Sequence, residues 1–190
     1  NNLDFFQLEQ RFYIKGRKMT QPTLPGKYQV SASLDIFAPQ ADVWDVLKEF
    51  ADVYTWVPTV KESHAIGIGS QCVGAGRHCF LEGFGEIDEY ITQWEDGTGF
   101  VYDVSPLGPL DKAFSSWWLT SPGKNVTRLN VTFAYELRFG LFGKMMHKIM
   151  MRPKLETSLP QALEALKTRV ETGKVLRPLV DGTLASKKAA

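Results

Sequence analysis

The regular pattern of the chain begins with an alternation of apolar and polar residues. Over Tyr28–Phe37 (YQVSASLDIF) every second residue is apolar, which is typical of a strand with one buried face. Pro39 then presets the backbone for a helix start, and apolar residues recur at helical spacing over Asp42–Phe50. A second helical turn is predicted over Asp52–Trp56, ending before Pro58. The chain therefore opens with a strand and a pair of short helices.

A long series of strands follows, separated by turn residues. Gly, Pro, Asn and Asp divide the region after position 60 into short segments. Six strands are predicted: VKESHAI, RHCFLE, EIDEYITQWE, FVYDVS, KAFSSWWLTS and VTRLNVTFAYELRF. Over Phe142–Thr172 the spacing becomes helical again, with leucines along one face. Pro153 and Pro160 predict that this helix is kinked or divided into segments.

These elements predict an α+β fold, in which a curved antiparallel seven-stranded sheet wraps around a long C-terminal helix and two short helices follow the first strand. The apolar face of such a meander has to be covered, and the long helix is the available cover. One helix cannot fill the concave side of a strongly bent sheet, so a cavity between the two is expected. The predicted boundaries are a tag or upstream segment at 1–18, a lead at 19–27, the domain at 28–173 and a C-terminal tail at 174–190.

Composition excludes several classes of partner. The chain has 22 basic and 21 acidic residues, so its net charge of +1 gives no field that would attract nucleic acid. Cys72 and Cys79 do not have zinc-ligand spacing, and we expect neither a metal nor a cofactor. The sequence has no apolar run long enough for a membrane span and no secretory signal pattern, so a cytoplasmic location is expected. A monomer and a homodimer are both compatible with these features.

Four stretches of the chain resemble a known family: DVWDVLKEFADVYTWVPTVKE, VGAGRHCFLEGFGEIDEYITQWED, FVYDVSPLGPL and SLPQALEALKTRVETG. They are similar to the polyketide cyclase/dehydrase and lipid-transport (SRPBCC) superfamily, which has the START-like helix-grip fold. The resemblance covers Tyr28–Gly173. Within the superfamily the chain also looks like the plant abscisic acid receptors and the birch-pollen-allergen-like proteins, which hold small hydrophobic or aromatic ligands. Other members are aromatase/cyclases or lipid carriers, and fold alone does not choose among these functions.

The resemblance and the strand alternation together indicate polar contacts for a ligand. Lys61 matches the lysine with which the plant hormone receptors meet a ligand carboxylate; a solvated lysine on an edge strand is the alternative. Alternation places Glu89 on the same strand face as Ile87 and Ile91. It places Lys61 on the same face as Ser63 and Ala65. We predict that both faces are concave, so that Glu89 and Lys61 point into the cavity. A buried carboxylate needs a partner, which Lys61 or Arg77 could supply. The alternative for the pair is a purely structural ion pair under the helix, and the alternative for Arg77 is that it clamps the loop without touching a ligand.

The remaining candidate contacts are apolar, and four of them, Tyr102, Phe114, Phe133 and Tyr135, match cavity positions of the family. The candidate lining is Phe100, Tyr102, Phe114, Trp118, Phe133, Tyr135, Met146 and Ile149. Ordinary core packing is the alternative for each. The loops at 83–85 (GFG) and 106–109 (PLGP) correspond to the gate and latch at the cavity entrance. The methionine-rich, basic segment 139–152 could form a lid or floor, a weak membrane contact or plain core packing.

The leading hypothesis is a non-enzymatic binding or carrier protein for a small hydrophobic ligand, aromatic, polyketide-like or lipid. The alternatives are an aromatase/cyclase or dehydratase acting on a polyketide-like substrate and a membrane-associated lipid-transfer module. No nucleophile and base stand in a recognisable arrangement, so no catalytic residue is assigned. An enzyme should have acid and base groups with displaced pKa values in its cavity, whereas a carrier should have a mostly apolar lining with one or two polar anchors.

Overall fold

Seven strands form one sheet in the computed structural model, which describes residues 20–138, 140 and 145–179. The strands are β1 (Tyr28–Ile36), β2 (Val60–Gly67), β3 (Ala75–Leu81), β4 (Gly85–Glu95), β5 (Gly99–Val104), β6 (Leu110–Gly123) and β7 (Val126–Leu137). Their order is β1-β7-β6-β5-β4-β3-β2, and every neighbouring pair is antiparallel. The predicted meander is confirmed, with the first strand closing against the last.

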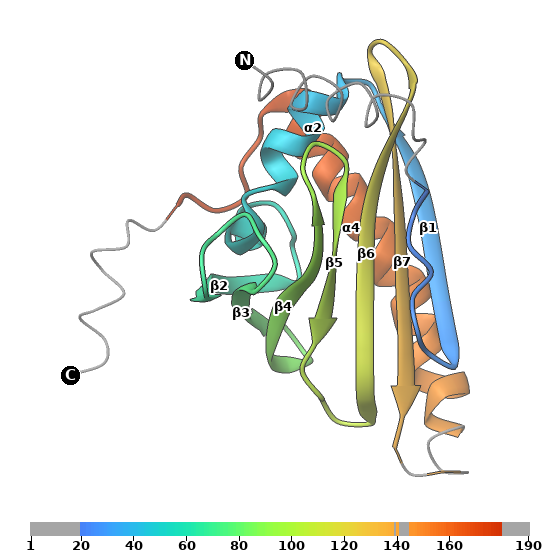
Figure 1. The fold of residues 1–190 in the computed structure, drawn as a ribbon. Coiled ribbons are helices and arrows are strands. Elements are labelled where there is room, and N and C mark those ends of the chain that lie inside the picture. The colour runs from blue at the N-terminus through green and yellow to red at the C-terminus, as the bar shows by residue number, and fades with distance from the viewer. Residues whose placement is uncertain (1–19, 139, 141–144, 180–190) are drawn as a thin grey trace, which may run out of the picture.

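Two short helices join β1 to β2, as predicted. The helix α2 (Gln40–Leu47) begins after Pro39, and η1 (Phe50–Thr55) is a 3-10 helix. Most of their apolar side chains are buried in the same core as the sheet, namely Val43, Trp44 and Leu47 of α2 and Phe50, Val53 and Tyr54 of η1. In Figure 1, α2 lies beside the upper part of the long helix.

The long helix α4 (Arg152–Thr172) runs behind the sheet (Figure 1). A π-helical segment, η2 (His147–Met151), precedes it. The helix therefore changes its hydrogen-bonding pattern just before Pro153, which lies in the first turn of α4 and cannot donate a backbone hydrogen bond. Pro160 lies inside the helix without ending it. The predicted segment at 1–18 and most of 139–144 lie outside the described residues.

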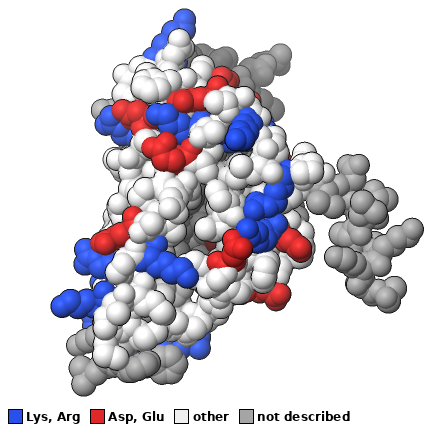
Figure 2. Space-filling model, turned by 180° about the vertical axis from the view of Figure 1, so that it is seen from behind, with Lys and Arg blue, Asp and Glu red and all other residues white. Residues whose placement is uncertain are grey.

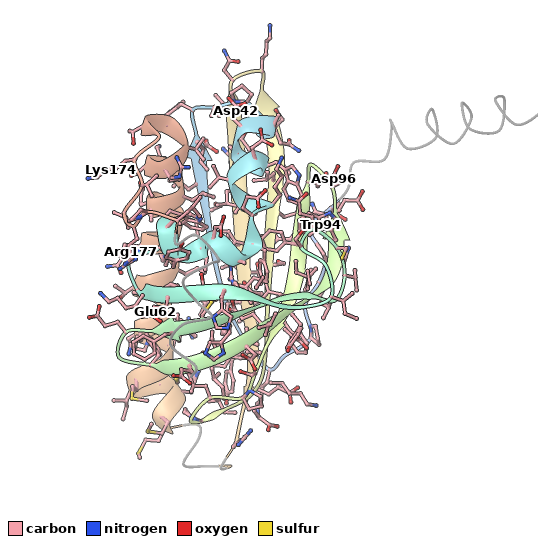
Figure 3. The ribbon with its side chains drawn as sticks, turned by 90° about the vertical axis from the view of Figure 1, so that its left-hand side faces the viewer. Asp42, Glu62, Trp94, Asp96, Lys174 and Arg177 are labelled. Atoms are coloured by element: carbon pink, nitrogen blue, oxygen red, sulfur yellow. The ribbon has the colours of Figure 1, made fainter. Side chains whose placement is uncertain are left out.

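The strong curvature of the sheet gives it two different faces. β2 and β3 run across the direction of β6 and β7 (Figures 1 and 3), so the inner face encloses α2, η1 and α4. The inner face carries the main core, in which Leu163 and Leu166 of α4 are almost fully buried. The outer face carries a small separate cluster of Leu24, Val101, Phe114 and Ala134.

The chain reverses direction at the end of α4. Gly173 ends the helix with a φ of 69°, a left-handed conformation that glycine adopts without steric cost. The backbone N–H of Leu176 then donates a hydrogen bond to the carbonyl oxygen of Thr55 in η1, at 2.8 Å. The first part of the predicted C-terminal tail is thus attached to the domain, and 180–190 lie outside the described residues.

Candidate ligand-binding site

A buried ion pair between Arg77 and Glu89 forms the polar centre of the inner face. The two residues are direct neighbours on β3 and β4, and their side chains are 9% and 8% exposed. The Nε of Arg77 donates to Oε2 of Glu89, and Nη1 donates to the carbonyl oxygen of Phe50 at 2.8 Å. The guanidinium carbon also lies 3.9 Å from the centre of the Phe50 ring. Arg77 therefore joins the sheet to η1.

The surroundings of this centre raise the pKa values of Arg77, Cys79 and Tyr102. Burial alone would lower the pKa of Arg77, but the charge and hydrogen bond of Glu89 outweigh burial and raise it. Burial raises the pKa of the Cys79 thiol to about 12, and this thiol donates to Oε2 of Glu89 at 3.9 Å. Burial, with the charge of Glu89, raises the pKa of Tyr102 to about 12. At neutral pH Arg77 is charged, and Cys79 and Tyr102 hold their protons.

Two residues of β6 complete the polar centre. The Nε1–H of Trp117 donates to Oγ of Ser115 at 3.1 Å. Hydrogen bonding with Ser115 and Trp117 lowers the pKa of Tyr102, but burial has the larger, opposite effect. Ser115 is 1% exposed and has no place among the residues predicted from the sequence. The available signal is that Ser115 alternates with Ala113 and Trp117 on one strand face, so that a hydroxyl interrupts an apolar stripe.

Aromatic rings fill the space around these polar groups. The ring of Phe50 lies 5.4 Å from each of the rings of Phe100 and Tyr102, and Trp56 lies 6.0 Å from Trp117. A cavity of only about 10 Å³ remains, lined by Leu47, Glu49, Phe50, Val53, Trp56, Arg77, Phe100 and Trp117. This volume accommodates roughly one water molecule. The part of the interior under η1 is therefore closed in this conformation.

The opposite side of the molecule from that in Figure 1 is hollowed near its centre. The space-filling view in Figure 2 shows this hollow on the face that carries α4, with charged residues of both signs on either side. A larger space of about 240 Å³ lies elsewhere, on the outer face, where Asp88, Asp103 and Asp111 contribute to its walls.

Lys61 and Glu89, which we expected to face one ligand together, have different partners. The Nζ of Lys61 lies 2.6 Å from Oε2 of Glu82, and these side chains are 36% and 65% exposed. Glu89 is paired with Arg77 instead. The sequence offered Lys61 or Arg77 as the partner of Glu89, and the structure selects the arginine on the neighbouring strand.

The predicted aromatic lining divides between the two faces of the sheet. Phe100, Tyr102, Phe133 and Tyr135 contribute to the inner core, and their contact with a ligand stays a prediction. Phe114 belongs to the outer cluster, so its assignment to the cavity is wrong. Alternation on β6 puts inner residues at 115 and 117 and outer residues at 114, 116 and 118.

Trp118 also lies on the outer face. It is opposite Gly99 of β5, where an added Cβ would come within 2.7 Å of the indole ring. The predicted contact of Trp118 with an internal ligand is therefore wrong, and Gly99 provides the space for the indole. Among the last two candidates, Met146 is half-buried and Ile149 is 71% exposed, so Ile149 faces solvent.

Tyr135 connects the sheet to the start of the long helix. Its hydroxyl lies 2.9 Å from Nδ1 of His147 in η2, and the His147 ring stacks on Tyr28 at 3.9 Å between centres. Burial, assisted by the charge of Arg152, lowers the pKa of His147, which favours the neutral imidazole at this contact. Tyr135 thus anchors η2 from within the core.

The predicted gate loop at 83–85 contacts α4. The Nζ of Lys154 lies 3.3 Å from the centre of the Phe84 ring and donates to the carbonyl oxygen of Gly83 at 3.4 Å. An added Cβ on Gly85 would lie 3.7 Å from Leu107, so the two predicted entrance loops are adjacent.

Metal centres and membrane spans are two further classes of feature that bear on function. Within the described part of the chain, no group of three or more His, Cys, Asp and Glu residues is placed to hold a metal ion. No helix in that part of the chain is long and apolar enough to cross a membrane.

The family of the chain follows from its sequence match. The family described as polyketide cyclase / dehydrase and lipid transport matches residues 27–171, which include all seven strands and nearly all of α4. The chain belongs to this family. A search of curated proteins found no matching sequence.

Solved structures agree with this membership. Zhui aromatase/cyclase from Streptomyces sp. R1128 has a TM-score of 0.67 and 14% identity, over 76% of this chain and 93% of that chain. TTHA0849 from Thermus thermophilus has a TM-score of 0.64 and 20% identity, over 77% and 99%. A START superfamily protein from Mycobacterium smegmatis has a TM-score of 0.62 and 15% identity, over 77% and 99%. At these identities the similarity establishes the START-like fold, and confirms that expectation, without establishing a ligand.

Proposed function

We propose that this protein binds a small hydrophobic ligand, carrying a neutral polar group, between the inner face of the sheet and α4. The observation that supports this most is the Arg77–Glu89 pair at the centre of an aromatic interior. The two charges cancel each other, so a charged ligand group would enter the interior without a counter-ion, at a high desolvation cost. A carbonyl or hydroxyl group could hydrogen-bond there at lower cost, beside Tyr102 and Ser115.

Binding without acid–base catalysis is favoured by the pKa directions. A general acid or base works best when its pKa lies near the working pH. The pKa values of Cys79 and Tyr102 are both raised to about 12, and that of Arg77 is raised as well. These groups hold their protons at neutral pH, which suits hydrogen-bond donors that recognise a ligand.

An aromatase/cyclase-like activity is the second candidate, because several donors converge on one place. Arg77, Tyr102 and Ser115 face the same aromatic interior, where donors could orient and polarise a carbonyl group of a polyketide-like substrate. The fold similarity to the Zhui aromatase/cyclase agrees with this candidate. Conversion of a polyketide-like substrate by the purified protein, lost in Tyr102→Phe, would support it.

A weak membrane contact through 139–152 is the third proposal. Met145, Ile149 and Met150 are 50%, 71% and 44% exposed, next to the basic Lys148. Exposed apolar residues beside a cation are typical of interfacial segments. Co-sedimentation with vesicles containing anionic lipid, and its loss in Ile149→Ser, would support this contact.

The binding proposal can be tested first by native mass spectrometry of protein purified without denaturation. A retained small molecule of defined mass is expected, and its fragmentation identifies the ligand class. The second test is a titration with a dansyl-labelled fatty acid and with its methyl ester. We expect the ester to bind at least as tightly as the acid, because the interior has no unpaired cation among the described residues.

Two matched variants locate the bound probe. Phe100→Leu removes a ring from the inner face and should weaken both probes about tenfold, whereas Phe114→Leu makes the same change on the outer face and should leave both affinities unchanged. Absence of any retained molecule, together with no saturable binding of either probe, would contradict the proposal.

A further inference from the structure

The segment that follows α4 is attached to η1 largely through Arg177. This segment, residues 174–178, is called the C-terminal strap below. The Arg177 guanidinium donates hydrogen bonds to four backbone carbonyl oxygens: through Nη1 to Tyr54 (2.8 Å), Val60 (2.9 Å) and Val57 (3.4 Å), and through Nη2 to Pro58 (3.1 Å). A planar guanidinium with five N–H groups can serve several acceptors at once in this way.

Other hydrogen bonds hold the strap in the same place. The backbone N–H of Leu176 donates to the carbonyl oxygen of Thr55 at 2.8 Å, and the Tyr54 hydroxyl donates to that of Pro178 at 3.4 Å. At the chain reversal, Nη1 of Arg169 donates to the carbonyl oxygen of Gly173 at 3.0 Å. The strap lies beyond residues 27–171, the part of the chain that the family matches.

The carbonyl groups that Arg177 contacts belong to the end of η1 and to the turn that leads into β2. The last carbonyls of a helix lack partners within the helix, and an arginine side chain can satisfy them. Through these contacts the strap fixes the end of η1 that is farther from Phe50. In Figure 3, Lys174 and Arg177 are labelled beside α4, on the side of the molecule where the strap descends.

η1 is the cover over the polar centre. Phe50 supplies a carbonyl group and a ring to Arg77, and Val53 and Trp56 line the cavity of about 10 Å³. That volume admits no ligand larger than water, so a ligand can enter this space beside Arg77 only if η1 or its side chains move. Whatever holds η1 in place therefore controls access to this part of the interior.

We propose that the C-terminal strap regulates access to the interior by holding η1 closed, with Arg177 as its positioning residue. For ligands, this inference rests on the proposed binding function. Access itself does not depend on that function, and a thiol inside the protein can report it. Cys79 lies opposite Ser63 of β2, whose hydroxyl donates to the carbonyl oxygen of Ala51 in η1 at 2.5 Å, and Cys79 is 1% exposed.

The test measures the alkylation rate of Cys79 by iodoacetamide, followed by intact-mass spectrometry. The background is Cys72→Ser, because Cys72 is exposed and would react first. Arg177→Met keeps most of the side-chain length but removes the charged hydrogen bonds, and should speed alkylation about tenfold or more. Arg177→Lys, which keeps the charge, should restore part of the protection. Lys174→Ala removes a positive charge from the same strap without touching those carbonyls, and should leave the rate unchanged.

Hydrogen exchange separates local opening from a general loss of stability. In Arg177→Met, exchange should become faster in 50–60 and stay unchanged in β6 and β7. An unchanged Cys79 rate would overturn the proposal, as would equal acceleration of exchange throughout the sheet. With the dansyl fatty acid methyl ester, both association and dissociation should accelerate in Arg177→Met, with a smaller change in Kd. If this probe does not bind wild-type protein while Cys79 still becomes reactive, the binding function fails and the strap stands.

Discussion

Two ion pairs near β3 have similar chemistry but very different surroundings. The Arg77–Glu89 pair lies on the inner face of the sheet, with both side chains less than 10% exposed. The Lys61–Glu82 pair lies at the surface, with side chains 36% and 65% exposed. In each pair a positively charged side chain contacts a glutamate. The buried pair also holds η1 through the Phe50 carbonyl group, while the exposed pair contacts water that can replace either partner.

The environment of a charged pair decides how much the pair contributes to the free energy of unfolding. An exposed pair contributes little to the free energy of unfolding, because water solvates each charge almost as well as the partner does. A buried pair has already lost its water, so each member depends on the other. The sequence predicted Lys61 as a ligand contact by resemblance, but the buried Arg77 is the residue that connects the sheet to η1.

The largest expected effect comes from breaking the buried pair. Glu89→Gln leaves the Arg77 charge buried without a counter-ion, and should lower the free energy of unfolding by about 3–5 kcal/mol. Urea denaturation at neutral pH, followed by tryptophan fluorescence, measures this loss. Glu82→Gln makes the same chemical change at the exposed pair and serves as the control.

Removal of both charges sharpens the same comparison. The double variant Arg77→Met, Glu89→Leu leaves no buried charge at this centre, so it should recover most of the stability lost in Glu89→Gln. It should also lose selectivity for ligands with a polar group. If the double variant is as unstable as Glu89→Gln, the loss arises from packing and not from an unpaired charge.

An intermediate effect is expected at alkaline pH. The pKa of Tyr102 is about 12 in the folded protein against an ordinary value of 10.0, so the folded state holds this proton more tightly. The corresponding stability is complete below pH 10 and is lost as the pH rises to about 12, and it amounts to about 1–3 kcal/mol. The free energy of unfolding of wild type should therefore fall more steeply over this range than that of Tyr102→Phe. Parallel curves would show that Tyr102 is not desolvated.

The smallest effect is expected at the exposed pair. Lys61→Ala should change the free energy of unfolding by less than about 1 kcal/mol. It should also leave the affinities for the dansyl fatty acid and for its methyl ester unchanged, because Lys61 interacts with Glu82 and not with the interior. A selective loss of affinity for the acid would restore Lys61 as a contact for an anionic ligand.

Sequence patterns were sufficient to predict the strands and helices and much of their order. Alternation located the first strand and predicted that Glu89 faces inward with Ile87 and Ile91, which the inner core confirms. Arg77 was available as a counter-charge because β3 and β4 are joined by a short turn, so their register brings the two residues opposite each other. Local spacing was sufficient in these cases, since the decisive contacts link neighbouring segments.

The tertiary structure alone decided the two features on which the site depends. In KAFSSWWL, apolar residues occupy both faces of β6, so alternation could not tell the inner Trp117 from the outer Trp118. The strap was unpredictable for a different reason. Arg177 interacts with carbonyl groups 117 to 123 residues earlier in the chain, and backbone carbonyls are present at every residue, so no side-chain pattern in the sequence marks these acceptors.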